Sequence, residues 1–187
     1  MSKLASIGEA AQVLGVSLLF FAIAATFLTV SGIRINLTDS MPLGFYRMTP
    51  GKIERGSIAM ICPDLTNPAV RVAYERGYFP ARWFACEGGV APLLKPVLAL
   101  PGDLVEVAQE GIRVNGQEIE NSGRLASDSA GRPLPWLASS GEVPARHVWL
   151  FSNYSPASFD SRYFGTVETS AILGKMEPVA VLDTHHL

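Results

Sequence analysis

Apolar residues fill one uninterrupted stretch near the start of the chain. Residues 10–30 read AAQVLGVSLLFFAIAATFLTV and contain no charge and no proline. Coiled as a helix, about 20 residues cross the roughly 30 Å of hydrocarbon in a bilayer, so we expect a transmembrane helix here. A cleaved secretory signal is the alternative, although the apolar core of such a signal usually runs only about 7 to 15 residues.

Beyond this stretch the pattern changes to short apolar runs that are separated by glycine and proline. The clearest runs lie at residues 57–62, 93–100, 104–107, 147–151 and 179–182. Runs of this length between turn residues predict β-strands. We therefore divide the chain into an N-terminal tail and anchor, residues 1–34, and one mainly β domain, residues 35–187.

Two further segments are distinguished by their turn residues. Asn115 and Gly116 lie between short alternating runs, and both central positions of a two-residue hairpin turn need a positive φ, which these residue types adopt readily. The sequence therefore predicts a β-hairpin at this point. Residues 120–142 are polar and rich in serine, glycine and proline, which is typical of a long surface loop.

Composition and charge narrow the range of functions. The 187 residues are 48% hydrophobic and carry a formal net charge of −2, which indicates a folded domain with an unusually apolar addition. The chain contains no basic tract, so we expect no binding to nucleic acid.

Cys62 and Cys86 are the only two cysteines, and both follow the apolar stretch. An even number of cysteines in an exported domain fits one disulfide, which would close a loop around residues 64–85; two buried thiols are the alternative. Because no pair of histidines lies nearby, the cysteines do not resemble a zinc site, and we expect neither a metal nor another cofactor. The charges on the two sides of the apolar stretch do not decide its orientation in the membrane. A disulfide would place the domain outside the cytoplasm.

Lys95 is the only charged residue between Glu87 and Asp103, and it lies inside an apolar run. If this side chain is buried, desolvation lowers its pKa, and a neutral amine can act as a general base. The alternative is a lysine that extends along an edge strand into solvent. Pro96 favours an edge strand because it lacks an amide donor.

The polar segment NLTDSMPLG, residues 36–44, follows the apolar stretch and supplies hydroxyl groups at Thr38 and Ser40. Serine is a weak nucleophile without a base, and lysine can serve as that base in place of histidine. The backbone amide of Ser40 and the hydroxyl of Thr38 would then form an oxyanion hole.

Three segments resemble the signal peptidase I (leader peptidase) superfamily of Ser-Lys endopeptidases. Ser40-Met41-Pro42 is similar to the box that bears the nucleophile, KPVLALPGD at residues 95–103 to the strand that bears the base, and SFDSRYFG at residues 158–165 to the last box. The small size, the cysteine pair and the ACEGGVAPLLKPV sequence before the lysine resemble the TraF-type conjugative transfer signal peptidases within this superfamily.

The resemblance implies a signal-peptidase/LexA-like β fold and a role for each site residue. Ser40 would be the nucleophile and Lys95 the general base. The supporting residues would be Thr38 as an oxyanion donor, Ser158 to orient the Lys95 amine, and Asp160 and Arg162 as an ion pair.

The resemblance also implies that the protein is a membrane-anchored serine endopeptidase. It would process an exported pilin-like precursor in conjugative transfer or type IV secretion, alongside components of that apparatus. Water would resolve the acyl-enzyme on Ser40, or an amine of the same pilin would do so and close the pilin into a ring. The protein would cross the lipid bilayer of the bacterial inner membrane once, with its catalytic domain in the periplasm.

Other functions stay open at this point. A general signal peptidase I would remove signal peptides from secretory precursors, and an inactive membrane scaffold of a secretion channel would retain the fold alone. A LexA-like self-cleaving repressor shares the chemistry, but no helix-turn-helix segment precedes Ser40. A Ser-His-Asp site would need His147, which begins an apolar run, or His185 and His186 at the end of the chain, and no G-x-S-x-G motif surrounds Ser40.

Overall fold

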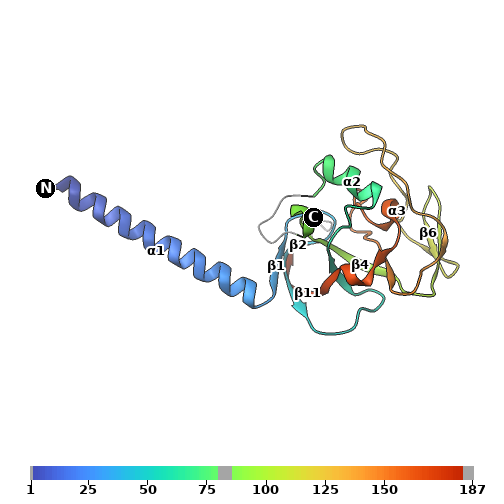
Figure 1. Ribbon diagram of the computed structural model, residues 1–187, viewed down its shortest axis with the longest axis horizontal. Coiled ribbons are helices and arrows are strands. Elements are labelled where there is room, and N and C mark those ends of the chain that lie inside the picture. Colours follow the sequence, from blue (N-terminus) through green and yellow to red (C-terminus); the bar gives the residue numbers. More distant parts are fainter. Residues whose placement is uncertain (1, 80–85, 183–187) are drawn as a thin grey trace. The chain divides into compact units, whose positions relative to one another are not determined.

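A computed structural model describes residues 2–79 and 86–182 of the chain (Figure 1). The chain divides into two compact units, Met1–Arg34 and Ile35–Leu187. Each unit is described by itself. The periplasmic location that the sequence suggests for the second segment stays a prediction.

The N-terminal unit consists mainly of one helix, α1 (Ser2–Val30). Its large apolar side chains are exposed on all sides, and at least 60% of the surface of each of the following is accessible: Val13, Leu14, Val16, Leu18, Leu19, Phe20, Phe21 and Ile23. The predicted helix is therefore confirmed. Its predicted membrane span is not supported, because no helix in the part of the chain that the structure describes is long and apolar enough to cross a bilayer.

The second unit is mainly β, as expected, and contains two sheets (Figure 1). The larger sheet has seven strands in the order β1-β2-β11-β3-β4-β9-β10, and the smaller has four in the order β7-β6-β5-β8. In chain order the strands are β1 (Ile33–Asn36), β2 (Leu43–Thr49), β3 (Ile58–Ile61), β4 (Leu93–Ala99), β5 (Leu104–Val107), β6 (Ile112–Val114), β7 (Gln117–Ile119), β8 (Gly141–Glu142), β9 (His147–Leu150), β10 (Val167–Glu168) and β11 (Ile172–Leu182).

All five apolar runs that predicted strands lie in strands of the structure. The last run forms only the end of β11, which begins at Ile172 and pairs with both β2 and β3. The predicted hairpin joins β6 to β7, with φ values of 52° at Asn115 and 80° at Gly116. These positive angles are the reason that asparagine and glycine occupy the turn.

Short helices cover part of the larger sheet. The helix α2 (Pro68–Glu75) is capped by Asn67, whose side-chain oxygen accepts from the amides of Ala69 and Val70. The helix α3 (Ser161–Phe164) is capped by Asp160, and one-turn 3-10 helices lie at Glu87–Gly89 and Thr169–Ala171. The buried faces of α2 and α3 share one apolar cluster that holds α3 in place.

The predicted disulfide between Cys62 and Cys86 is present. It ties the residue after β3 to the start of Glu87–Gly89, and the enclosed segment contains α2. Residues 80–85 of the enclosed segment lie outside the described residues. The bridge therefore closes the segment that carries α2 onto the larger sheet.

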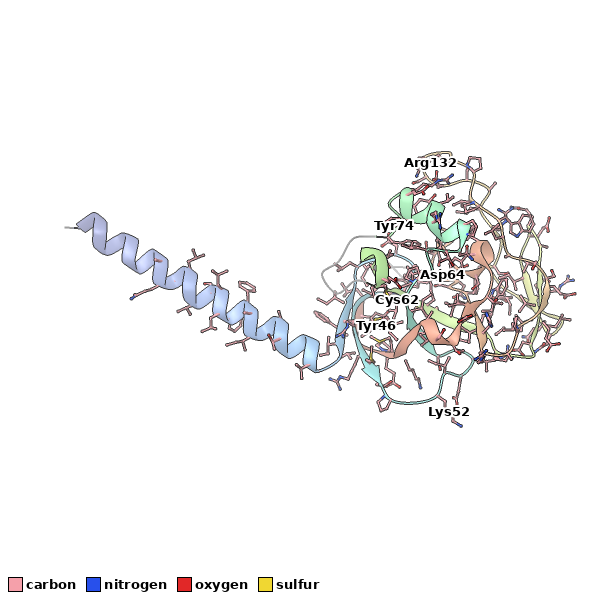
Figure 2. The ribbon with its side chains drawn as sticks, viewed as in Figure 1. Tyr46, Lys52, Cys62, Asp64, Tyr74 and Arg132 are labelled. Carbon is pink, nitrogen blue, oxygen red and sulfur yellow. A yellow bond between two sulfur atoms is a disulfide. The ribbon has the colours of Figure 1, made fainter. Side chains whose placement is uncertain are left out.

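The long loop at residues 120–142 lies on the surface, as expected, and polar contacts fasten it to the region of α2. Asp128 accepts hydrogen bonds from the Tyr78 hydroxyl at 2.6 Å and from Arg132 Nε at 2.8 Å, and Arg76 donates to the carbonyl of Pro133 at 2.8 Å. Figure 2 shows Arg132 on this loop next to α2. The loop is thus anchored in the middle as well as at its ends.

The disulfide should stabilise the folded domain by restricting the unfolded chain. We expect a variant with Cys62→Ser and Cys86→Ser to lose about 2 to 4 kcal/mol in its free energy of unfolding, given the 24-residue separation of the two cysteines. Denaturant unfolding of the purified protein measures this loss. The reduced wild-type protein is the control and should unfold at the same denaturant concentration as the variant; an unchanged midpoint in both would contradict the prediction.

Candidate active site

Ser40 lies in the turn that connects β1 to β2, and its side chain is half-buried. The turn is closed by the side chain of Asn36, the last residue of β1. Gly44 at the start of β2 allows β2 to pair closely with β11, because a Cβ at this position would overlap the carbonyl oxygen of Ala180. The local sequence therefore presents Ser40 at the tip of a short, tightly bonded connection.

Thr38 is a polar neighbour of the Ser40 hydroxyl. The two side-chain oxygens lie 3.2 Å apart, and the Thr38 hydroxyl also donates to Asn36 Oδ1 at 2.8 Å. The structure thus brings Thr38 beside Ser40, as the sequence predicts. Its role in an oxyanion hole stays a prediction.

Lys95 lies in β4, which pairs with β3 on one side and β9 on the other, so the strand is in the interior of the sheet. The alternative of an edge strand is therefore wrong. Pro96 lies within this interior strand although it lacks an amide donor, and its carbonyl oxygen accepts a hydrogen bond from the Phe151 amide, just beyond the end of β9. The pairing of Ala59 with Lys95 places only a small side chain opposite the lysine.

The Lys95 side chain is only 2% exposed, and its amine donates to Ser158 Oγ at 2.8 Å. Burial lowers the pKa of Lys95 to about 8, since the charged form loses its hydration; the negative charge of Asp160 raises it and the positive charge of Arg162 lowers it. Near pH 8 a large fraction of this amine is therefore neutral. A neutral amine has the lone pair that a general base needs.

Ser158 is oriented by Asp160. Its hydroxyl donates to Asp160 Oδ2 at 2.9 Å, so the single proton of this hydroxyl is used and its lone pairs face the Lys95 amine. Lys95 consequently donates one of its protons to Ser158. This bond fixes the direction in which the remaining positions of the amine point.

Asp160 and Arg162 form the predicted ion pair, and both are almost completely buried, with exposures of 0% and 1%. Arg162 Nε and Nη2 contact the two oxygens of Asp160 at 2.8 and 2.9 Å. The guanidinium also donates to the carbonyls of Ser158 and Gly123. Because its polar groups are bonded, the pair can remain charged in the interior.

Ser152, two residues after β9, connects the two halves of the site. Its hydroxyl donates to the backbone carbonyl of Ser40, and its amide donates to Asp160 Oδ2 at 3.3 Å. A continuous series of hydrogen bonds therefore runs from Ser40 through Ser152, Asp160 and Ser158 to Lys95. Ser40 and Lys95, which are 55 positions apart in the sequence, thus belong to one network.

The structure brings together all six predicted site residues, but their catalytic roles stay predictions. Within the described residues no hydrogen bond joins Lys95 to the Ser40 hydroxyl, and in substrate-free enzymes such bonds often form only with substrate. Sequence reasoning missed Asn36 and Ser152. Asn36 had a local signal, since asparagine commonly bonds the backbone two residues ahead; Ser152 had none.

His147 lies at the opposite end of β9 from Ser152, and its Nδ1 lies 3.1 Å from the carbonyl oxygen of Ala145. It lines a cavity of about 370 Å³ with residues that include Asp64 and Glu168. His185 and His186 lie outside the described residues. Among the residues that the structure describes, no three His, Cys, Asp or Glu side chains group as a metal site requires.

The arrangement can support nucleophilic chemistry without a metal or a histidine. A half-buried hydroxyl, a buried amine with a lowered pKa and a charged pair that orients the amine are the components of a Ser-Lys site. The Ser40 amide and the Thr38 hydroxyl lie on the same turn, where an oxyanion could be bound.

Comparison with known proteins places the chain in a family. The family described as "Signal peptidase, peptidase S26" matches residues 7–180. The "Plasmid transfer protein TraF" of Escherichia coli is 39% identical over 153 residues, which cover 80% of this chain and 83% of that protein. The "Conjugal transfer protein TraF" of Agrobacterium fabrum (strain C58) is 38% identical and covers 98% of this chain and 99% of its own.

A further relative is the "Probable conjugal transfer protein TraF" of Sinorhizobium fredii, which is 43% identical over 79% of this chain and 77% of its own length. The crystal structure of a signal peptidase I from Enterococcus faecalis aligns with 68% of this chain and 98% of its own, but with 19% identity and a TM-score of 0.38. The assignment therefore depends on the sequence matches alone. On that basis the chain belongs to the signal peptidase family, peptidase S26, in the group of the TraF transfer proteins.

Proposed function

We propose that the protein is a serine endopeptidase with a Ser40–Lys95 dyad, and that it processes an exported pilin-like precursor during conjugative transfer. The single observation that carries the proposal is the buried Lys95 amine, which donates to Ser158 and has a pKa lowered to about 8. The relatives named as plasmid and conjugal transfer proteins supply the context. A disulfide persists in oxidising compartments, which supports a periplasmic catalytic domain.

In the proposed mechanism Lys95 removes the Ser40 proton as Ser40 Oγ attacks the scissile carbonyl carbon. The oxyanion is stabilised by the Ser40 amide and the Thr38 hydroxyl, and collapse of the intermediate expels the amine with the proton from Lys95. The resulting acyl-enzyme is hydrolysed by water. An amine of the same pilin can take the place of water, which would join the ends of the pilin in a ring.

Ser40→Ala and Lys95→Arg should each abolish processing of a pilin-derived peptide by the purified protein. The alanine has no nucleophile, and arginine keeps its proton throughout the accessible pH range. Two controls should retain activity: Ser122→Ala, at a buried serine that bonds strands of the smaller sheet, and Lys52→Arg, at an exposed lysine (Figure 2). A fully active Lys95→Arg enzyme would show that Lys95 is not the base.

The same variants separate the remaining functions in cells. Normal pilus assembly with Ser40→Ala would indicate a scaffold, and cleavage of unrelated secretory precursors would indicate a general signal peptidase. Mass spectrometry of the mature pilin tests the fate of the acyl-enzyme. A product that is lighter than the linear chain by one water would show that a ring was formed.

The pH dependence should follow the ionisation of Lys95. Because the base must be neutral, kcat/KM should rise about tenfold per pH unit below a pKa of about 8 and level off above it. Initial rates across this range, with substrate well below KM, give the profile of the free enzyme. His147→Ala should leave the profile in place; loss of the rising limb in that variant would assign it to the histidine.

Asp160→Asn should affect stability and the pH profile together. It leaves Arg162 buried without a counter-charge, which should cost about 3 to 5 kcal/mol in the free energy of unfolding. Because the Asp160 charge raises the pKa of Lys95, its removal should move the rising limb of kcat/KM to lower pH. Asp128→Asn, in the network beside α2, is the control; its limb should not move. A shift of the Asp160→Asn limb to higher pH would contradict the assignment.

A further inference from the structure

The side chain of Asn36 makes many hydrogen bonds to the turn that carries Ser40, although it has no role in the mechanism proposed for Ser40 and Lys95. It is buried at the end of β1, and its Nδ2 donates to the carbonyls of Thr38 at 3.0 Å, Met41 at 2.9 Å and Pro42 at 3.1 Å. Its Oδ1 accepts from the Thr38 amide at 3.2 Å and from the Thr38 hydroxyl at 2.8 Å. Because the NH2 group has only two protons, at least one proton is shared between two of the three carbonyls. The single amide group therefore contacts five polar atoms of the turn that carries Ser40.

These partners determine which way the Asn36 amide points. Three carbonyl oxygens face one end of the group and two donors face the other, so exchanging nitrogen for oxygen would oppose acceptors to acceptors. The Oδ1 atom can only accept. The hydrogen bond between Thr38 Oγ1 and Asn36 Oδ1 therefore uses the proton of the threonine hydroxyl.

A hydroxyl has one proton, so this bond limits what Thr38 can do for Ser40. At the 3.2 Å contact between the two hydroxyl oxygens, Thr38 can only accept, and Ser40 must donate. In the free protein the Thr38 hydroxyl thus accepts a hydrogen bond from the Ser40 hydroxyl. To stabilise an oxyanion, the Thr38 hydroxyl must turn from Asn36 to the substrate oxygen, and its proton stays on Thr38 throughout.

We infer that Asn36 is a positioning residue for the proposed reaction: it shapes the turn that presents Ser40 and sets the direction of the Thr38 hydroxyl. Two other side chains also bond the turn: the Ser152 hydroxyl donates to the carbonyl of Ser40, and the Tyr46 hydroxyl donates to that of Pro42 at 2.8 Å. Asn36 differs from Ser152 and Tyr46 in that it also accepts a hydrogen bond from the Thr38 hydroxyl. This inference rests on the proposed function, because it concerns how Ser40 and Thr38 act.

The test compares Asn36→Ala with a matched substitution elsewhere, using a pilin-derived peptide and the full-length protein. Asn67→Ala is the control, because Asn67 also accepts two hydrogen bonds through Oδ1 and donates one through Nδ2, but it caps α2. Asn36→Ala should lower kcat roughly ten- to a hundredfold with KM nearly unchanged, because misplacement of reacting groups mainly affects the chemical step. The rising limb of the pH profile should not move, since the bonds to Lys95 are intact. Asn67→Ala should leave kcat of the folded protein unchanged.

A double substitution separates positioning from a loss of stability. Thr38→Val alone should lower kcat, and in the Asn36→Ala background it should lower kcat by a smaller factor, because Asn36 acts in part through Thr38. If Asn36→Ala does not fold, Asn36→Ser provides the same comparison, since serine can accept from the Thr38 amide but is too short to bond the carbonyls of Met41 and Pro42.

Three results have distinct meanings. Wild-type kcat in folded Asn36→Ala, or in folded Asn36→Ser where the alanine variant does not fold, would overturn the inference, as would fully multiplicative effects of the Asn36 and Thr38 substitutions. If Ser40→Ala also processes the peptide normally, the proposed function itself fails. Inactive Ser40→Ala together with a wild-type rate in the Asn36 variant would leave the function standing and remove only the role of Asn36.

Discussion

The buried ion pair between Asp160 and Arg162 is the interaction on which the geometry of the site depends. Two charges can remain in the interior only if they face each other and if their other donors and acceptors are also bonded. The pair meets this requirement with groups from separate parts of the chain: the carbonyl of Gly123 in the long loop, the hydroxyl of Ser158 beside α3 and the amide of Ser152 after β9. The hydrogen bonds that satisfy the pair therefore hold these three segments together.

The same pair explains why Lys95 can have a lowered pKa beside a carboxylate. An isolated Asp160 would stabilise the ammonium form and raise the pKa of the lysine, but the positive charge of Arg162 opposes this effect and lowers the pKa. Desolvation then decides the direction of the shift, and the pKa falls to about 8. The neutral hydroxyl of Ser158 donates to Asp160 and accepts from Lys95, so it orients the amine without adding a charge.

The nucleophile is positioned by a different kind of contact. Charges hold the base in the interior, whereas neutral hydrogen bonds from Asn36 and a backbone anchor on Ser152 hold the turn around Ser40. The two systems meet at Ser152, whose hydroxyl donates to the Ser40 carbonyl and whose amide donates to Asp160. Hydrogen bonds in a connected network of low dielectric can strengthen one another, so the orientation of the base and the placement of the nucleophile are physically coupled.

Local patterns in the sequence determined a large part of this protein. Alternating and apolar runs specified most strands, and the positive φ values that Asn115 and Gly116 adopt specified the hairpin, because both depend on neighbouring residues only. The apolar run at residues 10–30 determined a helix but not the predicted membrane span. The six site residues were found through a resemblance in sequence motifs, not through spacing alone. Only the tertiary structure decided that β4 is an interior strand, which makes Lys95 a buried amine, and that Ser152 lies between Ser40 and Asp160. Strand order and burial arise from pairings between distant segments, and no local pattern records them.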